Sequence, residues 1–343
     1  MAERPLRLAL VGATGAVGRA ALEVLEDLDV PVASLRPLAS GRSAGGAVPF
    51  QGEDLRVEEV RQGSFRGSDL ALLAAPAAAA RAWAPVARAE GCLVVDASSA
   101  FRGDAGVPLL VPGVNPEEAA LLPRGIAASA CGLVPALALV LRAIRDAAGL
   151  PRVGVVALES ASGAGRAGIA QLESESLALM TGREPDPPAT IPYRLAFNLV
   201  PDASRAGEAG GGVEAEALLA ADLARVLGGE LAVSATAVRV PVFYGHAAVV
   251  SLTTRKPLSA EEARALLRSA AGVKVIDDPA ERLYPMPMLS VNDDAVLAGR
   301  VREDPTRENG LELFLAVDNL RRGGATNLVE VARLVAGRHL GAG

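Results

Sequence analysis

The sequence predicts an α/β protein of two domains, the first of which contains a parallel sheet. With 343 residues, the chain is longer than a single hydrophobic core usually organises, so we expect about two domains. In its first third, apolar runs of strand length alternate with helical patterns. Such alternation predicts parallel strands joined by right-handed crossovers. A glycine-rich turn joins the first apolar run to the first helical pattern.

The first strand is expected at 6–11 and the first helix at 19–28, with the pattern G-x-x-G-x-x-G between them. Glycines in such a turn let the backbone approach a pyrophosphate, which then lies on the helix N-terminus. The context predicts a Rossmann-type dinucleotide-binding domain, although glycine turns of this kind also occur without a nucleotide. The expected cofactor contacts in the turn are Gly12, Thr14, Gly15, Ala16, Val17 and Gly18.

The next elements indicate which dinucleotide is bound. Arg42 and Ser43 lie where the second strand should end, at the position that recognises the adenosine ribose. An acidic residue there would favour NAD, whereas Arg42 and Ser43 favour the 2′-phosphate of NADP. The alternative is a solvated loop arginine. Further strands are expected at 70–74 and 92–96, with a helix at 77–89 between them.

Cys131 directly precedes an apolar helical run, 133–144. Unpaired backbone N–H groups and the positive end of a helix dipole favour a thiolate, so Cys131 is a candidate nucleophile. The alternative is a buried structural cysteine, which is the commoner fate of a free cysteine. Arg102 lies on a loop beyond the strand at 92–96, and its planar guanidinium suits a phosphate or a carboxylate.

The chain has two histidines, His246 and His339. His339 lies four residues from the C-terminus, in a tail that we expect to be mobile, so His246 is the candidate acid or base. The alternative is a satisfied core histidine. A strand is expected at 237–242 with a turn at Gly245. Arg239 and His246 are separated by an odd number of residues, so the turn must redirect His246 if both groups meet one substrate.

Composition limits the class of partner. The net charge of −6 and the lack of a basic cluster argue against nucleic acid. No apolar stretch reaches the roughly 20 residues of a membrane span, and no signal peptide precedes the first strand, so a cytoplasmic location is expected. Two cysteines favour a reducing compartment, and no Cys/His spacing predicts a metal site. A small-molecule substrate is therefore expected.

Motifs along nearly the whole chain resemble those of the aspartate-semialdehyde dehydrogenase family. After the glycine turn and R-S-A-G at 42–45 come D-x-S-S-A-F-R at 96–102, Cys131, S-G-A-G at 162–165, F-N-x-x-P at 197–201, R-V-P-x-x-x-G-H at 239–246 and D-N-L-R-x-G at 318–323.

The resemblance implies NADPH-dependent reductive dephosphorylation of L-aspartyl 4-phosphate to L-aspartate 4-semialdehyde, in the biosynthesis of lysine, threonine and methionine. It implies a Cys131 thioester, His246 as acid/base, Arg102 as the phosphate ligand and Arg239 as the ligand of the substrate α-carboxylate. Ser162, Gly163 and Asn319 are implied cofactor contacts. The partners implied are the substrate, inorganic phosphate and a second copy of the chain.

The implied architecture is an NADP-binding domain over 1–128 and an α+β catalytic and dimerisation domain over 129–316. A C-terminal helix at about 317–343 is expected to return to the first domain. A loop is expected at 202–212, because that segment is rich in glycine and alanine.

Departures from the family pattern leave two alternatives open. Glu159, which we expect among the substrate-binding residues, stands where the family has glutamine, and an anion there would oppose nucleophilicity of a nearby thiol. Ala130 precedes Cys131 where the family has asparagine, and the stretch 213–225 lacks the family's substrate-binding lysine. The chain could therefore be a non-catalytic paralogue. Alternatively, it could reduce another acyl phosphate, for example that of an N-acetylated glutamate.

Overall fold

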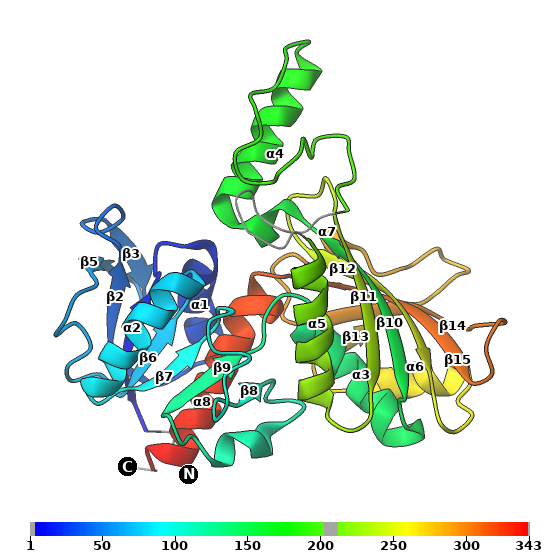
Figure 1. Ribbon diagram of the computed structural model, residues 1–343, viewed down its shortest axis with the longest axis horizontal. Coiled ribbons are helices and arrows are strands. Elements are labelled where there is room, and N and C mark those ends of the chain that lie inside the picture. Colours follow the sequence, from blue (N-terminus) through cyan, green and yellow to red (C-terminus); the bar gives the residue numbers. More distant parts are fainter. Residues whose placement is uncertain (1–3, 202–211, 342–343) are drawn as a thin grey trace. The chain divides into compact units, whose positions relative to one another are not determined.

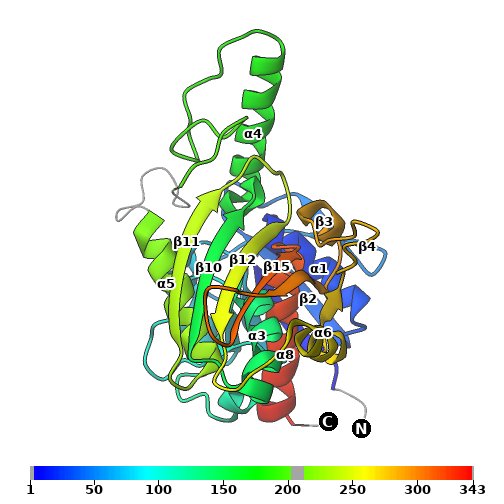
Figure 2. The same ribbon diagram turned by 90° about the vertical axis from the view of Figure 1, so that its right-hand side faces the viewer.

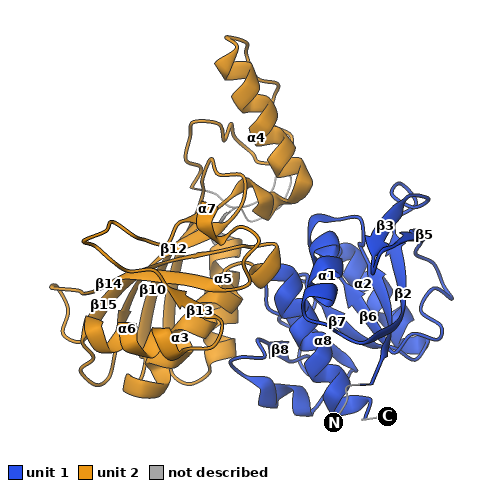
Figure 3. Cartoon of the chain, turned by 180° about the vertical axis from the view of Figure 1, so that it is seen from behind, with its two compact units in different colours: residues 1–131, 324–343 blue, residues 132–323 orange. Residues whose placement is uncertain are grey.

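The computed structural model describes residues 4–201 and 212–341, which form two compact units (Figure 3). Unit 1 comprises Met1–Cys131 and Gly324–Gly343, and unit 2 comprises Gly132–Gly323. The prediction of an α/β fold is confirmed, with a parallel sheet in unit 1 and a mixed sheet in unit 2. Of the loop expected at 202–212, residues 202–211 lie outside the described residues, and Gly212 begins a helix.

Unit 1 contains a seven-stranded sheet in the order β5-β2-β1-β6-β7-β9-β8, and every neighbouring pair is parallel (Figure 1). The chain leaves β1 for β2 on one side and returns to β6 on the other side. The carboxyl ends of β1 and β6 therefore form the switch point at which such sheets bind ligands. The strands are β1 Leu6–Val11, β2 Val32–Ala39, β5 Glu58–Glu59, β6 Leu70–Leu73, β7 Leu93–Asp96, β8 Leu109–Leu110 and β9 Ile126–Ser129.

Helices α1 (Ala16–Asp27), α2 (Ala77–Ala89) and α8 (Thr326–His339) pack on this sheet. Strands β3 (Ala47–Phe50) and β4 (Glu53–Arg56) form a separate antiparallel hairpin that contacts β2. The apolar face of α8 joins α1 and the strands in one core, so the C-terminal segment completes unit 1. The prediction that His339 lies in a mobile tail is wrong. It is the last residue of α8, and its Nε2 lies 2.8 Å from the carbonyl oxygen of Ala119.

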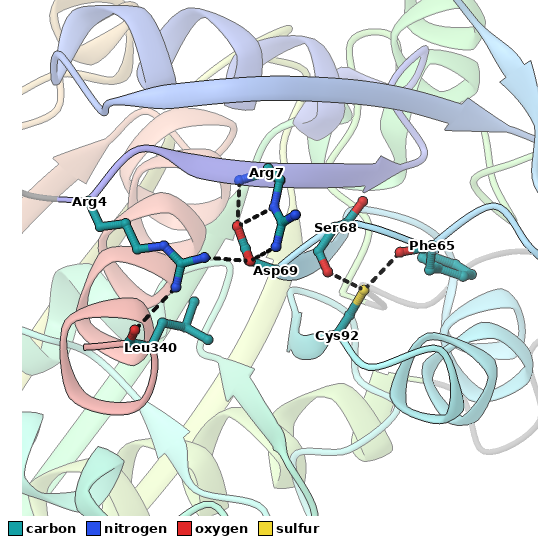
Figure 4. A network of polar contacts seen from close by, with 7 residues as sticks. All are labelled: Arg4, Arg7, Phe65, Ser68, Asp69, Cys92 and Leu340. Carbon is teal, nitrogen blue, oxygen red and sulfur yellow. Dashed lines mark hydrogen bonds and ion pairs between the residues drawn. The ribbon is translucent and has the colours of Figure 1, made fainter. Parts of the chain in front are cut away.

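A polar network joins three parts of unit 1 (Figure 4). The carboxylate of Asp69, just before β6, accepts hydrogen bonds from Arg7 in β1 and from Arg4. The Arg7 guanidinium holds the pKa of Asp69 below its usual value. Arg4 also donates to the carbonyl oxygen of Leu340, at the end of α8. Arg4 and Asp69 precede β1 and β6. The network therefore holds the end of α8 at the amino ends of these strands, opposite the switch point.

Unit 2 contains a six-stranded mixed sheet in the order β11-β10-β12-β15-β14-β13. Helices α3 (Val134–Ala148), α5 (Gly212–Leu227) and α6 (Ala260–Ser269) lie on one side of it, and α4 (Gly165–Met180) projects beyond the strands (Figure 2). A one-turn helix, α7 (Pro287–Ser290), precedes β14. The strands are β10 Arg152–Glu159, β11 Ala232–Arg239, β12 His246–Thr253, β13 Val273–Val275, β14 Val296–Glu303 and β15 Gly310–Val317.

A strand was expected at 237–242, and its predicted end is wrong. Strand β11 stops at Arg239, and His246 begins β12 after a turn in which Gly245 has φ +82°. Both strands pair with β10, so Arg239 and His246 flank its carboxyl end. In the part of the chain that the structure describes, no helix is long and apolar enough to cross a membrane.

Candidate active site

The glycine turn of unit 1 has the geometry of a dinucleotide-binding loop. Gly12 has φ +87°, and a Cβ atom there would lie 2.3 Å from the carbonyl oxygen of Ala74, after β6. A Cβ atom at Gly18 would lie 2.1 Å from the carbonyl oxygen of Gly12. Glycine is therefore required at both positions by close backbone approach.

Helix α1 begins at Ala16, after Gly15 as N-cap. Gly15 makes no side-chain cap hydrogen bond, and the first N–H groups of a helix can bind an anion. Thr14 and Gly15 precede them and are partly exposed. These features fit a pyrophosphate at the switch point.

The loop after β2 places Arg42 and Ser43 at the surface, with the Ser43 N–H donating to the carbonyl oxygen of Ser40 at 2.8 Å. Glu59 of β5 lies beside this loop, since a Cβ atom at Gly41 would be 2.5 Å from its Oε1. The sequence alone gave no sign that Glu59 lies here. The loop thus presents a guanidinium and a nearby carboxylate.

Cys131 of unit 1 is half-buried, and its Sγ accepts a hydrogen bond from the Arg102 guanidinium. Cations beside a cysteine stabilise the thiolate, which is its nucleophilic form. Arg102 is held in turn by its Nε, which donates to the carbonyl oxygen of Ser98 at 3.0 Å. Asp96, at the end of β7, accepts from the Ser98 N–H and hydroxyl at 3.1 and 2.8 Å. Burial raises the pKa of Asp96.

A residue of α8 fixes the segment that leads to Cys131. The Asn327 side-chain amide is fully buried and donates to the hydroxyl of Ser129 at 2.8 Å and to the carbonyl oxygen of Ala130 at 3.1 Å. Asn327 lies outside the sequence motifs, so no local pattern pointed to it. Helix α3 begins three residues after Cys131, at Val134, with Leu133 as N-cap.

Cys92 shows the contrasting environment within unit 1. It is fully buried, and its Sγ lies 3.2 Å from the carbonyl oxygens of Phe65 and Ser68 (Figure 4). Burial raises the pKa of this thiol to about 11. Cys92 is therefore a structural cysteine, whereas Cys131 contacts a cation.

In unit 2, His246 is buried and contacts Ser160. The Ser160 N–H donates to Nδ1 at 3.1 Å, and the Ser160 hydroxyl lies 3.0 Å from the same atom. Because Nδ1 accepts a backbone N–H, the neutral ring carries its proton on Nε2. Burial, with a smaller contribution from the Arg239 charge, lowers the pKa of His246 to about 3. His246 is thus a neutral Nε2–H donor around neutral pH.

Arg239 and Glu159 form an ion pair at the ends of two neighbouring strands. Their residues are register partners in β10 and β11, and Arg239 Nη1 lies 3.0 Å from Glu159 Oε2. Arg239 Nη1 also donates to the carbonyl oxygen of Ser160 at 3.1 Å. The anion expected at Glu159 is therefore compensated by a guanidinium. We call Glu159, Ser160, Arg239 and His246 the unit 2 cluster.

Gly163 leaves space beside this cluster. It lies in a one-turn helix at 161–164 and is exposed, and a Cβ atom there would be 2.6 Å from Arg239 Nη1 and 3.0 Å from His246 Nε2. Two donors can thus reach an acceptor at this point. The neighbouring Ser162 hydroxyl donates to Asn319 Oδ1 at 2.9 Å, and the Gly245 N–H donates to the same oxygen at 3.2 Å.

The predicted site residues fall into two groups. Unit 1 holds the glycine turn, Arg42, Ser43, Arg102 and Cys131, and unit 2 holds the cluster with Ser162, Gly163 and Asn319. Ser160 was missed, although it lies directly after Glu159 in the sequence. Among residues 4–201 and 212–341, no group of three or more His, Cys, Asp or Glu side chains could hold a metal ion.

Comparisons with known proteins show which family the chain resembles over most of its length. The family model "Semialdehyde dehydrogenase, NAD binding domain" matches residues 7–122, and "Semialdehyde dehydrogenase, dimerisation domain" matches residues 141–322. The aspartate-semialdehyde dehydrogenase of Aquifex aeolicus is 40% identical over 331 residues, which are 96% of this chain and 97% of that protein. That of Legionella pneumophila is 39% identical over 338 residues, 97% of this chain and 96% of that protein.

Solved structures are similar over the same extent. Aspartate semialdehyde dehydrogenase II from Vibrio cholerae has a TM-score of 0.93 at 34% identity, covering 98% of this chain and 100% of that chain. The same enzyme complexed with ASA has a TM-score of 0.93 at 34% identity, covering 98% of this chain and 99% of that chain.

Proposed function

The chain belongs to the aspartate-semialdehyde dehydrogenase family, and on that basis we propose that it reduces L-aspartyl 4-phosphate to L-aspartate 4-semialdehyde with NADPH. The observation that carries the proposal is the hydrogen bond from Arg102 to Cys131 Sγ. It gives Cys131 a cationic neighbour of the kind found beside nucleophilic cysteines.

Cys131 begins the proposed reaction. Its thiolate attacks the carbonyl carbon of the acyl phosphate, the bond from that carbon to the phosphate oxygen breaks, and inorganic phosphate leaves with the bonding electrons. A thioester remains on Cys131. Arg102, which donates a hydrogen bond to Cys131 Sγ, is proposed to bind the phosphate group. When bound, a nicotinamide dinucleotide would supply the hydride needed to reduce the Cys131 thioester. Cys131 would then leave the resulting aldehyde carbon as a thiolate.

His246 assists by hydrogen bonding. The thiolate enters and leaves as an anion, so the steps on carbon require no proton transfer. Negative charge develops on the carbonyl oxygen, and the Nε2–H group of His246 is a suitable donor to it. We therefore propose that His246 acts as a neutral hydrogen-bond donor, in place of the acid–base role expected from the sequence. Arg239 is proposed to bind the substrate α-carboxylate beside Gly163.

The glycine turn and the open start of α1 support a bound nicotinamide dinucleotide, and the Nδ2 group of Asn319 is a donor suited to the nicotinamide carboxamide. The exposed Arg42 and Ser43 support NADP. Both cysteines are free thiols, which supports a reducing compartment such as the cytoplasm.

Arg42→Ala is expected to weaken NADP binding by about tenfold to a hundredfold and NAD binding by less than about threefold, because a charged hydrogen bond to the 2′-phosphate is lost. Fluorescence titration with each cofactor measures this. Glu59→Gln is the matched variant, because the Glu59 carboxylate would accept a hydrogen bond from the free 2′-hydroxyl group of NAD. Equal losses for the two cofactors in Arg42→Ala would refute the assignment of Arg42.

A homodimer is proposed through unit 2. Val156 of β10 and Val249 of β12 are cross-strand partners, and their side chains are 40% and 39% exposed on the sheet face opposite the buried Val155 and Val250. The matched dimerisation-domain model covers both strands, and an exposed apolar sheet face suits such an interface. Sedimentation equilibrium should give twice the chain mass of 34.9 kDa at micromolar concentration, and a monomer there would contradict the proposal.

The activity is tested by NADP reduction with L-aspartate 4-semialdehyde, with and without inorganic phosphate. Turnover that requires phosphate would support the proposed reaction. The absence of lysine from 213–225 favours testing a second aldehyde, N-acetylglutamate 5-semialdehyde, in parallel. Preference for the acetylated aldehyde would assign the other acyl phosphate, and no turnover of either by a cofactor-binding protein would indicate a paralogue.

A further inference from the structure

We propose that Glu159 makes the unit 2 cluster selective for substrates with a free α-ammonium group, so that Glu159 and Arg239 together bind an α-amino acid as a zwitterion. The inference deepens the proposed function by assigning the group that distinguishes aspartyl substrates from deaminated or N-acylated ones.

The two charges are held side by side by the sheet. Glu159 and Arg239 are partners in the parallel pairing of β10 with β11, and each is the last residue of its strand. Neighbouring residues on paired strands project together, which accounts for the 3.0 Å distance between Arg239 Nη1 and Glu159 Oε2. The Arg239 side chain is 2% exposed and that of Glu159 is 21% exposed, so Glu159 is the more accessible partner.

This pairing penalises a ligand that carries only a carboxylate. Such a ligand would compete with Glu159 for the guanidinium and leave a carboxylate in a desolvated position without its counter-ion. Burial raises the pKa of Glu159 and the Arg239 charge opposes that effect, in agreement with a carboxylate that depends on its cationic neighbour.

A zwitterion avoids this penalty. Its carboxylate can pair with the Arg239 guanidinium, while its ammonium group pairs with the Glu159 carboxylate. The carboxylate and the ammonium group of an α-amino acid are attached to one carbon, so they can bind two adjacent side chains at the same time. An acetylated nitrogen is uncharged, and a deaminated substrate has no nitrogen, so both would leave Glu159 unpaired.

Two other glutamates of unit 2 are committed to the backbone. Glu216 Oε1 accepts the N–H of Ala237 at 2.8 Å, and Glu175 Oε2 accepts the N–H groups of Leu195 and Ala196 at 2.8 and 2.9 Å. Glu159, by contrast, is paired with Arg239 itself. It is the carboxylate that a substrate bound to Arg239 would meet.

The test is calorimetric titration of variants that also carry Cys131→Ser, so that neither thioester formation nor turnover contributes. The probes are L-aspartate 4-semialdehyde and succinate semialdehyde, which lacks the amino group. Glu159→Gln is expected to weaken binding of the first by about tenfold to a hundredfold, the range for a charged hydrogen bond, and to leave or improve binding of the second. Glu230→Gln, at a side chain that is 95% exposed, is the matched control and should change neither.

Equal weakening of both aldehydes in Glu159→Gln would overturn the inference, because Glu159 would then only support Arg239. Binding of neither aldehyde before the Glu159 substitution would overturn it as well. Phosphate-dependent turnover by the unsubstituted protein decides the proposed function independently. An active enzyme whose Glu159→Gln variant does not discriminate between the aldehydes would retain the function and lose only this inference.

Discussion

Replacing Cys131 by serine is expected to lower phosphate-dependent NADP reduction by about 10⁴-fold or more while the protein stays folded. The change is nearly isosteric, so the hydrogen bond from Arg102 and the positions of Ser129 and Ala130 should be retained. A serine hydroxyl is not ionised near neutral pH, so the acyl-transfer step loses its anionic nucleophile. Absorbance of NADPH measures the rate, and circular dichroism measures the fold.

Cys92→Ser provides the matched control, because it makes the same atomic change at the other cysteine. A serine hydroxyl can still donate to the carbonyl oxygens of Phe65 and Ser68, so the variant should fold and keep its turnover. Full activity of Cys131→Ser would remove Cys131 from the mechanism. Loss of activity in the Cys92 variant alone would show that the reactive thiol had been misassigned.

His246→Asn is expected to lower kcat by about 10²- to 10³-fold, and His246→Gln by clearly less. The glutamine amide can place an N–H group near the position of Nε2, whereas the shorter asparagine side chain reaches only to the position of Nδ1. A residue that works as a hydrogen-bond donor therefore tolerates glutamine better. Steady-state kinetics of the two variants decide this, and equal, severe losses would mean that His246 transfers a proton.

The lowered pKa of His246 also predicts a pH dependence of stability. Between pH 6.5 and 3 the unfolded chain binds a proton on this histidine that the folded chain does not, so the free energy of unfolding falls as the pH falls through this range. Relative to His246→Gln, the wild-type protein should lose about 2 kcal/mol between pH 7.5 and pH 5. Urea denaturation of both proteins at the two pH values measures it.

If the difference in stability between the two proteins is the same at pH 7.5 and at pH 5, the pKa of His246 in the folded protein lies near its ordinary value. The ring should also remain neutral from pH 5 upward, so no acidic limb near pH 6.5 should arise from it in kcat. A limb that disappears in His246→Gln would likewise contradict a neutral donor.

Much of unit 1 could be predicted from local patterns. The strand at Leu6–Val11 and the helix at Ala77–Ala89 have the bounds that the sequence gives them, because apolar runs and their flanking residues specify buried strands and amphipathic helices locally. The strand containing Arg239 was predicted to end at 242 but ends at 239, and His339 was expected in a mobile tail. Both errors arose where long-range packing, by β10 and by the core of unit 1, decides the local structure.

The sequence by itself determined the α/β class and the glycine turn, and it supplied the candidates for the chemically active side chains, since these follow from periodicity, backbone freedom and residue type. Only the tertiary structure decided what those side chains contact. Asn327 fixes the segment before Cys131 across a sequence separation of nearly 200 residues, Ser160 sets the proton on His246, and Arg239 compensates Glu159. Such contacts depend on strand register and burial, which set charge and protonation through distances that no local pattern contains.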